Sequence, residues 1–206
     1  MRLKNLVFIL AALAIVVGLA ACGSSTQAPK KMPDEARDKQ VAPKKGSEES
    51  DKQAQMVVKA PGDKTLKLTI PKMQRIKDRR IPTGAGTDEA LLKDNAAIHL
   101  TGTGYPWEKT ANVYIAGHRL GYSGTGSYLS FYDIDKLQNG DDIYLTDANG
   151  EKYTYKVFDV IVVDPTDLHV LNPVKGKNIV SLQACTLPDY SKRIIVQGEL
   201  EGIKKS

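Results

Sequence analysis

The chain has few cysteines, and their scarcity limits the chemistry that it can support. Only two occur among 206 residues, Cys22 and Cys185. No C-x-x-C or H-x-x-x-H spacing is present, so the sequence predicts no metal site of the zinc type. The glycine-rich loops match neither a P-loop nor the G-x-G-x-x-G pattern of dinucleotide-binding proteins, and we expect no cofactor.

The chain also lacks a basic stripe interleaved with aromatic residues. Its net charge is +5, from 29 Lys and Arg against 24 Asp and Glu. Part of this excess lies near the two ends of the chain. The sequence therefore predicts no nucleic-acid partner.

Large apolar side chains are scarce between residues 23 and 60, where Lys, Asp, Glu, Gln, Pro and Ser dominate. No aromatic residue occurs between Phe8 and Tyr105. A segment of this composition buries too little apolar area to offset the entropy lost on ordering. We predict a flexible charged stalk over residues 23–60, followed by one folded domain over residues 61–206.

The apolar run at the N-terminus is short. It extends from Leu6 to Ala21 behind a basic start, whereas a bilayer-spanning helix needs roughly 20 apolar residues. Such a run is typical of an export signal. It ends in Leu19-Ala20-Ala21-Cys22-Gly23, which resembles the lipobox of bacterial lipoproteins, whose cysteine becomes lipid-modified.

We therefore predict a lipoprotein-type signal or membrane anchor over residues 1–22, with lipid attachment at Cys22. An uncleaved short membrane anchor is the alternative. Either anchor places the rest of the chain on the extracellular face of the cell membrane.

Short apolar runs bounded by turn residues fill the domain and are typical of strands. We predict strands at residues 66–70, 112–118, 142–146, 152–163, 178–185 and 193–200. A short helix is expected at 88–93 with Thr87 as its cap, and a helical turn within 129–137. At least six strands with little helix predict a mostly β fold, a closed and mostly antiparallel β-barrel with short helices.

Cys185 has no disulfide partner if Cys22 is lipid-modified or lies in the bilayer. An unpaired thiol in an exported protein either forms an intermolecular disulfide or is reactive. The alternative is that Cys185 is a small buried apolar side chain without a chemical role. Cys185 ends one predicted strand, and Arg193 begins the next. The stretch between them contains Pro188 and Asp189, which are turn residues.

His118 ends the predicted strand 112–118 and precedes a glycine-rich loop. The other two histidines, His99 and His169, lie among apolar residues and are expected to be structural. An imidazole at a strand end that faces a loop is better placed for chemistry. Together with a thiol and a fixed positive charge, it supplies the groups needed for covalent acyl transfer.

Three segments resemble the sortase family of cysteine transpeptidases: Ala116-Gly117-His118, Ser181-Leu182-Gln183-Ala184-Cys185, and Arg193 eight residues later. The order histidine, cysteine, arginine is that of the family. The stretch from Thr186 to Arg193 is most similar to class E sortases of Gram-positive actinobacteria. The chain departs from the family's usual Thr-Leu-x-Thr-Cys strand end, because Ser181 and Ala184 replace the two threonines.

The resemblance implies a sortase-type β-barrel and a transpeptidase that cleaves an LPxTG or LAxTG sorting signal between Thr and Gly. Cys185 would be the nucleophile, His118 the general acid and base, and Arg193 the stabiliser of the oxyanion or substrate. Implied partners are surface proteins with C-terminal sorting signals and a cell-wall amine, such as the peptidoglycan precursor. The alternatives are a pilin-polymerising sortase and a non-catalytic peptide-binding envelope lipoprotein with a sortase-like barrel.

Overall fold

The computed structural model describes residues 58–205. The predicted signal at 1–22, including Cys22, lies outside these residues, and so does the predicted stalk apart from residues 58–60. Both stay predictions. No helix within the described part of the chain is long and apolar enough to cross a bilayer.

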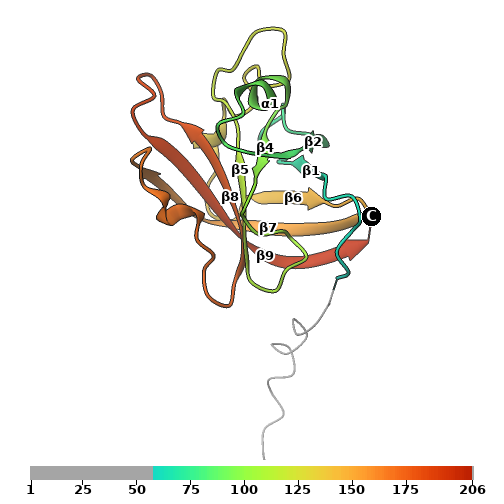
Figure 1. Cartoon of the computed structure of the whole chain (residues 1–206). Helices are drawn as coiled ribbons and strands as arrows, with labels where there is room; N and C mark the ends of the chain where they lie inside the picture. Colours follow the sequence, from blue (N-terminus) through green and yellow to red (C-terminus); the bar gives the residue numbers. More distant parts are fainter. Residues whose placement is uncertain (1–57, 206) are drawn as a thin grey trace, which may run out of the picture. The chain divides into compact units, whose positions relative to one another are not determined.

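Residues 58–205 form one nine-stranded sheet (Figure 1). Its strands are β1 (Leu66–Thr69), β2 (Arg79–Ile81), β3 (Thr83–Gly84), β4 (Ile98–Leu100), β5 (Ala111–Ala116), β6 (Asp142–Thr146), β7 (Glu151–Val163), β8 (Asn178–Cys185) and β9 (Arg193–Lys205). The helices are short: α1 (Glu89–Asp94) and the 3-10 turns η1 (Ile134–Lys136) and η2 (Leu168–Leu171). The fold is therefore mostly β, as predicted.

The strand order β2-β1-β6-β7-β9-β8-β5-β4-β3 makes β2 and β3 the two edges of the sheet. Only Pro82 separates these edge strands in the chain. The backbone thus steps directly from one edge to the other, and the sheet curls into a nearly closed barrel. This closure protects the edges, which would otherwise expose unpaired backbone groups.

Most strand pairs are antiparallel, but β5 pairs in parallel with β8, and β3 with β4. The β5–β8 pair lies inside the sheet, between β9 and β4. Parallel strands end at the same edge of a sheet. The C-terminal ends of β5 and β8 therefore lie together, although more than 60 residues separate them in the sequence.

The barrel interior is filled by side chains that alternate along the strands. Inward-facing members include Leu66, Leu68, Val113, Ile115, Phe131, Leu145, Val180, Leu182, Ala184 and Val196. Phe131 packs beneath the end of β5, where a Cβ added to Gly117 would lie 2.9 Å from its ring. Only glycine lets the strand end pack this closely on the core.

The helix α1 begins one residue later than predicted, and its cap was assigned wrongly. Asp88, rather than Thr87, occupies the cap position. The Asp88 carboxylate accepts a hydrogen bond of 2.9 Å from the backbone N–H of Leu91. A carboxylate reaches the free N–H groups of the first turn and also favours the positive end of the helix dipole.

Candidate active site

The register of the sheet brings the ends of β5 and β8 level. Ala116 pairs with Gln183, and the N–H of Gly117 donates to the carbonyl of Gln183 at 3.0 Å. Continuing this register by two residues sets His118 level with Cys185. β5 ends at Ala116, two residues before the predicted end, so His118 lies just past β5 and beside the end of β8.

Arg193 lies directly opposite Cys185 in the antiparallel β8–β9 pair. Residues in this relation have Cβ atoms about 4.5–5.5 Å apart and point to the same face. The structure therefore brings together His118, Cys185 and Arg193 at one end of the barrel.

These side chains face outward. Ala184 is 2% exposed and belongs to the core, so Cys185 beside it points to the other face. The Cβ direction of Gly117 meets the core ring of Phe131, so His118 also points outward. Cys185 is a free thiol of intermediate exposure. The methyl group of Ala184, the residue that departs from the family pattern, lies inside the barrel and away from the thiol.

The outer face beside Cys185 has a largely apolar floor. Tyr114, Val170 of η2 and Ile195 form a buried cluster there. The hydroxyl of Tyr114 donates to Gln183 Oε1 at 2.7 Å. Burial raises the pKa of Tyr114, and the charge of Arg193 offsets part of this rise. The Tyr114 hydroxyl therefore stays neutral and can donate, and it lies close enough to Arg193 for the guanidinium charge to affect its pKa.

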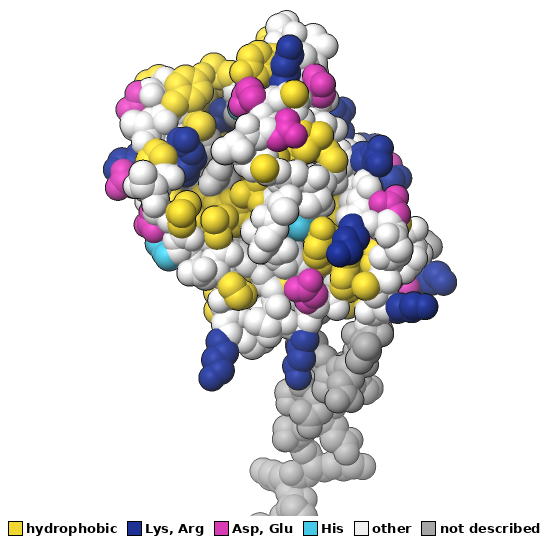
Figure 2. Space-filling model, in the orientation of Figure 1, with side chains coloured by type: hydrophobic (Ala, Val, Ile, Leu, Met, Phe, Trp, Pro, Cys, Tyr) yellow, Lys and Arg dark blue, Asp and Glu magenta, His cyan; other side chains and the backbone are white. Residues whose placement is uncertain are grey.

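Apolar side chains remain exposed around this floor. Leu168 of η2 is 65% exposed, and Val174 and Tyr190 are also exposed. Figure 2 shows apolar side chains gathered on the part of the surface where β8 ends and β9 begins in Figure 1. An apolar surface next to a thiol and a guanidinium suits an extended peptide with apolar residues.

The loop between β8 and β9 orients Arg193. Its Nη1 donates to the carbonyl oxygens of Tyr190 at 3.3 Å and Lys192 at 3.1 Å. The guanidinium makes no other hydrogen bond within residues 58–205, so its Nε and Nη2 donors are available to a ligand. A guanidinium stays charged at any working pH and cannot serve as a base.

A carboxylate that the sequence analysis missed contacts His118. Glu89 Oε1 at the start of α1 lies 3.5 Å from His118 Nε2 and accepts a hydrogen bond of 2.7 Å from the Tyr122 hydroxyl. The rings of His118 and Tyr122 meet edge to face, with centroids 5.7 Å apart. The hydrogen bond to Glu89 raises the pKa of Tyr122, which keeps this phenol a donor.

This contact distinguishes the two ring nitrogens of His118. Nε2 is buried, lies 3.5 Å from the Glu89 carboxylate and forms no hydrogen bond with any described residue, which leaves Nδ1 as the nitrogen for proton transfer. No sequence motif links Glu89 to His118, because the two residues are 29 positions apart and belong to different elements.

The loop after His118 is fixed by backbone contacts. The His118 carbonyl accepts hydrogen bonds from the N–H of Phe131 at 3.0 Å and the hydroxyl of Ser130 at 3.2 Å. The side chain of Arg119 is buried and forms an ion pair with Asp135 at 3.1 Å. These contacts hold the strand end and limit the positions open to the imidazole.

The other two histidines lie elsewhere in roles that require no catalysis. His99 is fully buried, with ring nitrogens in contact with the hydroxyl oxygens of Thr83 and Thr103 and the carbonyl of Gly104. Burial lowers the pKa of His99 and favours its neutral form. His169 is exposed and pairs with Asp167. Within residues 58–205, no three His, Cys, Asp or Glu side chains lie together as a metal site would require.

Comparison with known proteins agrees with this geometry. A family model described as the Sortase domain matches residues 68–201. Sortase A of Bacillus anthracis is 32% identical over 68% of this chain and 58% of its own length. Sortase A of Streptococcus agalactiae is 28% identical over 66% of this chain and 49% of its own length. The chain thus spans about half the length of these curated relatives.

Solved structures show the same likeness. A lid mutant of Sortase A from Corynebacterium diphtheriae superposes with a TM-score of 0.57 and 28% identity, covering 70% of this chain and 74% of that one. Sortase C-1 from Actinomyces oris gives a TM-score of 0.57 and 28% identity, with coverage of 68% and 74%.

Proposed function

Because this chain belongs to the sortase family, we propose that it is a cysteine transpeptidase acting on proteins with C-terminal sorting signals. The observation that carries the proposal is that the strand register places His118, Cys185 and Arg193 at one end of the barrel. Cys185 and Arg193 are cross-strand partners, and His118 follows the end of β5, the parallel neighbour of β8, by two residues.

Cys185 is the nucleophile in this mechanism. Its sulfur attacks the threonine carbonyl of the signal while His118 Nδ1 takes the thiol proton. The oxyanion receives hydrogen bonds from the free donors of Arg193. The tetrahedral intermediate collapses to a thioester, and the glycine amine leaves with the proton held by His118.

The second half of the reaction reverses the roles. An acceptor amine attacks the thioester, and His118 Nδ1 removes its extra proton as the new amide forms. The thiolate of Cys185 leaves and is reprotonated by His118. Glu89 lies 3.5 Å from Nε2, so the imidazolium formed in each half-reaction has a carboxylate beside it.

The substrate class is testable by trapping the acyl-enzyme. We expect an LPxTG or LAxTG peptide to increase the protein mass by the fragment that ends at threonine, with the adduct on Cys185. Added triglycine should remove the adduct and yield a peptide–triglycine product. Mass spectrometry checks both steps, with a scrambled peptide as control. The absence of any adduct with either peptide would contradict the proposed signal.

We also propose that the enzyme is of class E and is tethered to the outer face of the membrane through residues 1–22. The class rests on the stretch from Thr186 to Arg193 and the tether on the lipobox-like segment. Replacing Cys22 with alanine is expected to abolish labelling by a fatty-acid analogue and to reduce the membrane-bound fraction. Full retention without label would support a spanning anchor instead.

Glu89 is expected to support His118 without contacting the substrate. Glu89→Gln removes the charge but leaves an oxygen for Tyr122, and exposed ion pairs typically contribute about 0.2–1 kcal/mol. We therefore expect kcat/KM to fall by about 1.4- to fivefold. Glu108→Gln, at another exposed acid, should change nothing.

The ring of His118 provides a second readout. In the neutral imidazole, the ¹⁵N shifts should report the proton on Nε2, and Glu89→Gln should move them toward a mixture of both forms. A purely structural role for Glu89 would leave these shifts unchanged. Unchanged shifts together with unchanged kcat/KM would remove Glu89 from the mechanism.

A further inference from the structure

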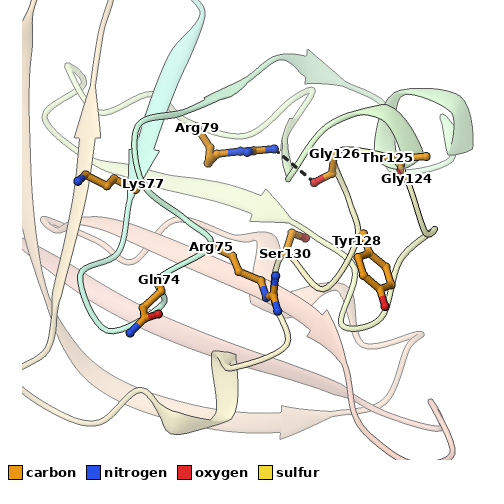
Figure 3. A pocket seen from close by; sticks show the side chains of 9 residues that line it. All are labelled: Gln74, Arg75, Lys77, Arg79, Gly124, Thr125, Gly126, Tyr128 and Ser130. Atoms are coloured by element: carbon orange, nitrogen blue, oxygen red, sulfur yellow. Dashed lines mark hydrogen bonds between the residues drawn. The ribbon is translucent and has the colours of Figure 1, made fainter.

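A pocket outside the active site is lined by basic side chains (Figure 3). It has a volume of about 470 Å³ and lies between the β1–β2 loop and the loop that follows His118. The first loop contributes Arg75 and Lys77, β2 begins with Arg79, and no Asp or Glu lines the pocket. The opposite wall runs from Gly124 to Ser130.

The β1–β2 loop presents its cations from a fixed backbone. Ile70, Met73 and Ile76 are buried in the core, while the basic residues between and after them are exposed. Three backbone hydrogen bonds of 2.8–2.9 Å link these apolar residues to one another. A rigid loop loses less entropy when its side chains bind a ligand.

The opposite wall is equally well fixed. A Cβ added to Gly126 would lie 2.2 Å from the carbonyl oxygen of Asp94, so this wall packs directly against the end of α1. Ser130 is buried and donates its hydroxyl to the His118 carbonyl. The pocket therefore shares a wall with the loop that positions His118.

The cations of the pocket lack acidic partners. Asp78 pairs with Lys67 at 3.2 Å, and Asp133 pairs with Lys136 at 2.7 Å. Within residues 58–205, Arg75 and Lys77 form no ion pair. The guanidinium of Arg79 donates one hydrogen bond of 3.5 Å, to the carbonyl of Gly126.

Figure 3 shows how these side chains lie. The guanidinium groups of Arg75 and Arg79 extend toward the wall formed by Gly126, Tyr128 and Ser130, whereas Lys77 turns away. The pocket thus offers two planar guanidinium groups as N–H donors. The hydroxyl of Tyr128, which also lines the pocket, forms no hydrogen bond within the described residues.

We propose that this pocket binds the phosphate group of a phosphate ester or a diphosphate. Two guanidinium forks match phosphate oxygens in pairs, whereas lysines would supply only point charges. The two guanidinium charges and the absence of lining acids favour an anion that carries more than one charge. The proposal does not depend on the transpeptidase activity.

Isothermal titration of the full chain in a neutral detergent at low ionic strength tests the site, with inorganic diphosphate as the probe. We expect one diphosphate per chain. Arg75→Gln/Arg79→Gln should weaken binding at least tenfold, and Arg75→Lys/Arg79→Lys should weaken it less. Lys204→Gln/Lys205→Gln, with the same change of charge at the end of β9, should bind like the wild type.

Glycerol phosphate, which carries the phosphate of a lipid head group without acyl chains, separates the two sources of phosphate. Tighter binding of diphosphate would assign a free diphosphate, and tighter binding of glycerol phosphate would assign a head group. Equal losses in the arginine and β9 variants would reveal general charge attraction and overturn the proposal. Absence of binding by both probes would overturn it as well. Thermal unfolding of each variant checks that the fold persists.

Discussion

Replacing Cys185 with alanine is expected to abolish cleavage of a sorting-signal peptide. Without the sulfur no thioester forms, and the remaining groups cannot split the reaction into two steps. Removing a covalent nucleophile from a protease costs on the order of 10⁶-fold in kcat. Turnover should therefore fall below detection in a fluorescence-quenched peptide assay, and the mass adduct should disappear.

The same variant separates catalysis from binding. Cys185 is partly exposed on the outer face, so alanine should lower the free energy of unfolding by less than about 1 kcal/mol. The peptide should still bind, which fluorescence anisotropy can measure. If the wild-type protein also binds but never cleaves, the chain is a peptide-binding protein on a sortase barrel. Cleavage by the alanine variant would show that another group is the nucleophile.

Replacing Arg193 with lysine is expected to give the second largest loss. Lysine keeps the positive charge but lacks the planar guanidinium fork. In the wild type this fork donates to the Tyr190 and Lys192 carbonyls through Nη1 and leaves other N–H groups for the substrate. Loss of one oxyanion donor typically costs about 2.7–4 kcal/mol, so kcat should fall roughly 10²- to 10³-fold. Peptide binding should change much less than kcat.

Lys192 offers a matched control for this variant. Its side chain pairs with Asp164 in solvent, and Lys192→Gln removes a positive charge from the residue next to Arg193. We expect kcat to stay within about twofold of wild type, because exposed ion pairs contribute little. Near wild-type turnover in Arg193→Lys, or an equal loss in Lys192→Gln, would exclude a specific role for the guanidinium fork.

Much of the β architecture was predictable because strand signals are local. For β6, the alternation of apolar and polar residues predicted Asp142–Thr146, which is the strand that the structure shows. For β8, the apolar run predicted Asn178–Cys185, again with the bounds found in the structure. Turn residues mark where these strands end. The short strands β2, β3 and β4 were missed, since two or three residues are too few to show a period.

The residue types of the site were also evident from the sequence. Cys185 and Arg193 flank a loop with turn residues, so their pairing across β8 and β9 follows once the two strands form a hairpin. The link to His118 is different. It depends on the parallel pairing of β5 with β8, and no local pattern specifies which strands become neighbours or in what register.

The sequence by itself determined the six longer strands, because each shows its pattern within a short stretch of chain. It also singled out His118, Cys185 and Arg193 as candidate site residues and predicts an anchor at residues 1–22. Only the tertiary structure decided that Glu89 faces His118, that Ala184 points into the core, and that Arg75 and Arg79 share a pocket with the loop after His118. These relations join segments distant in the chain. They arise when the barrel closes and buries its apolar faces, which fixes register and neighbours together.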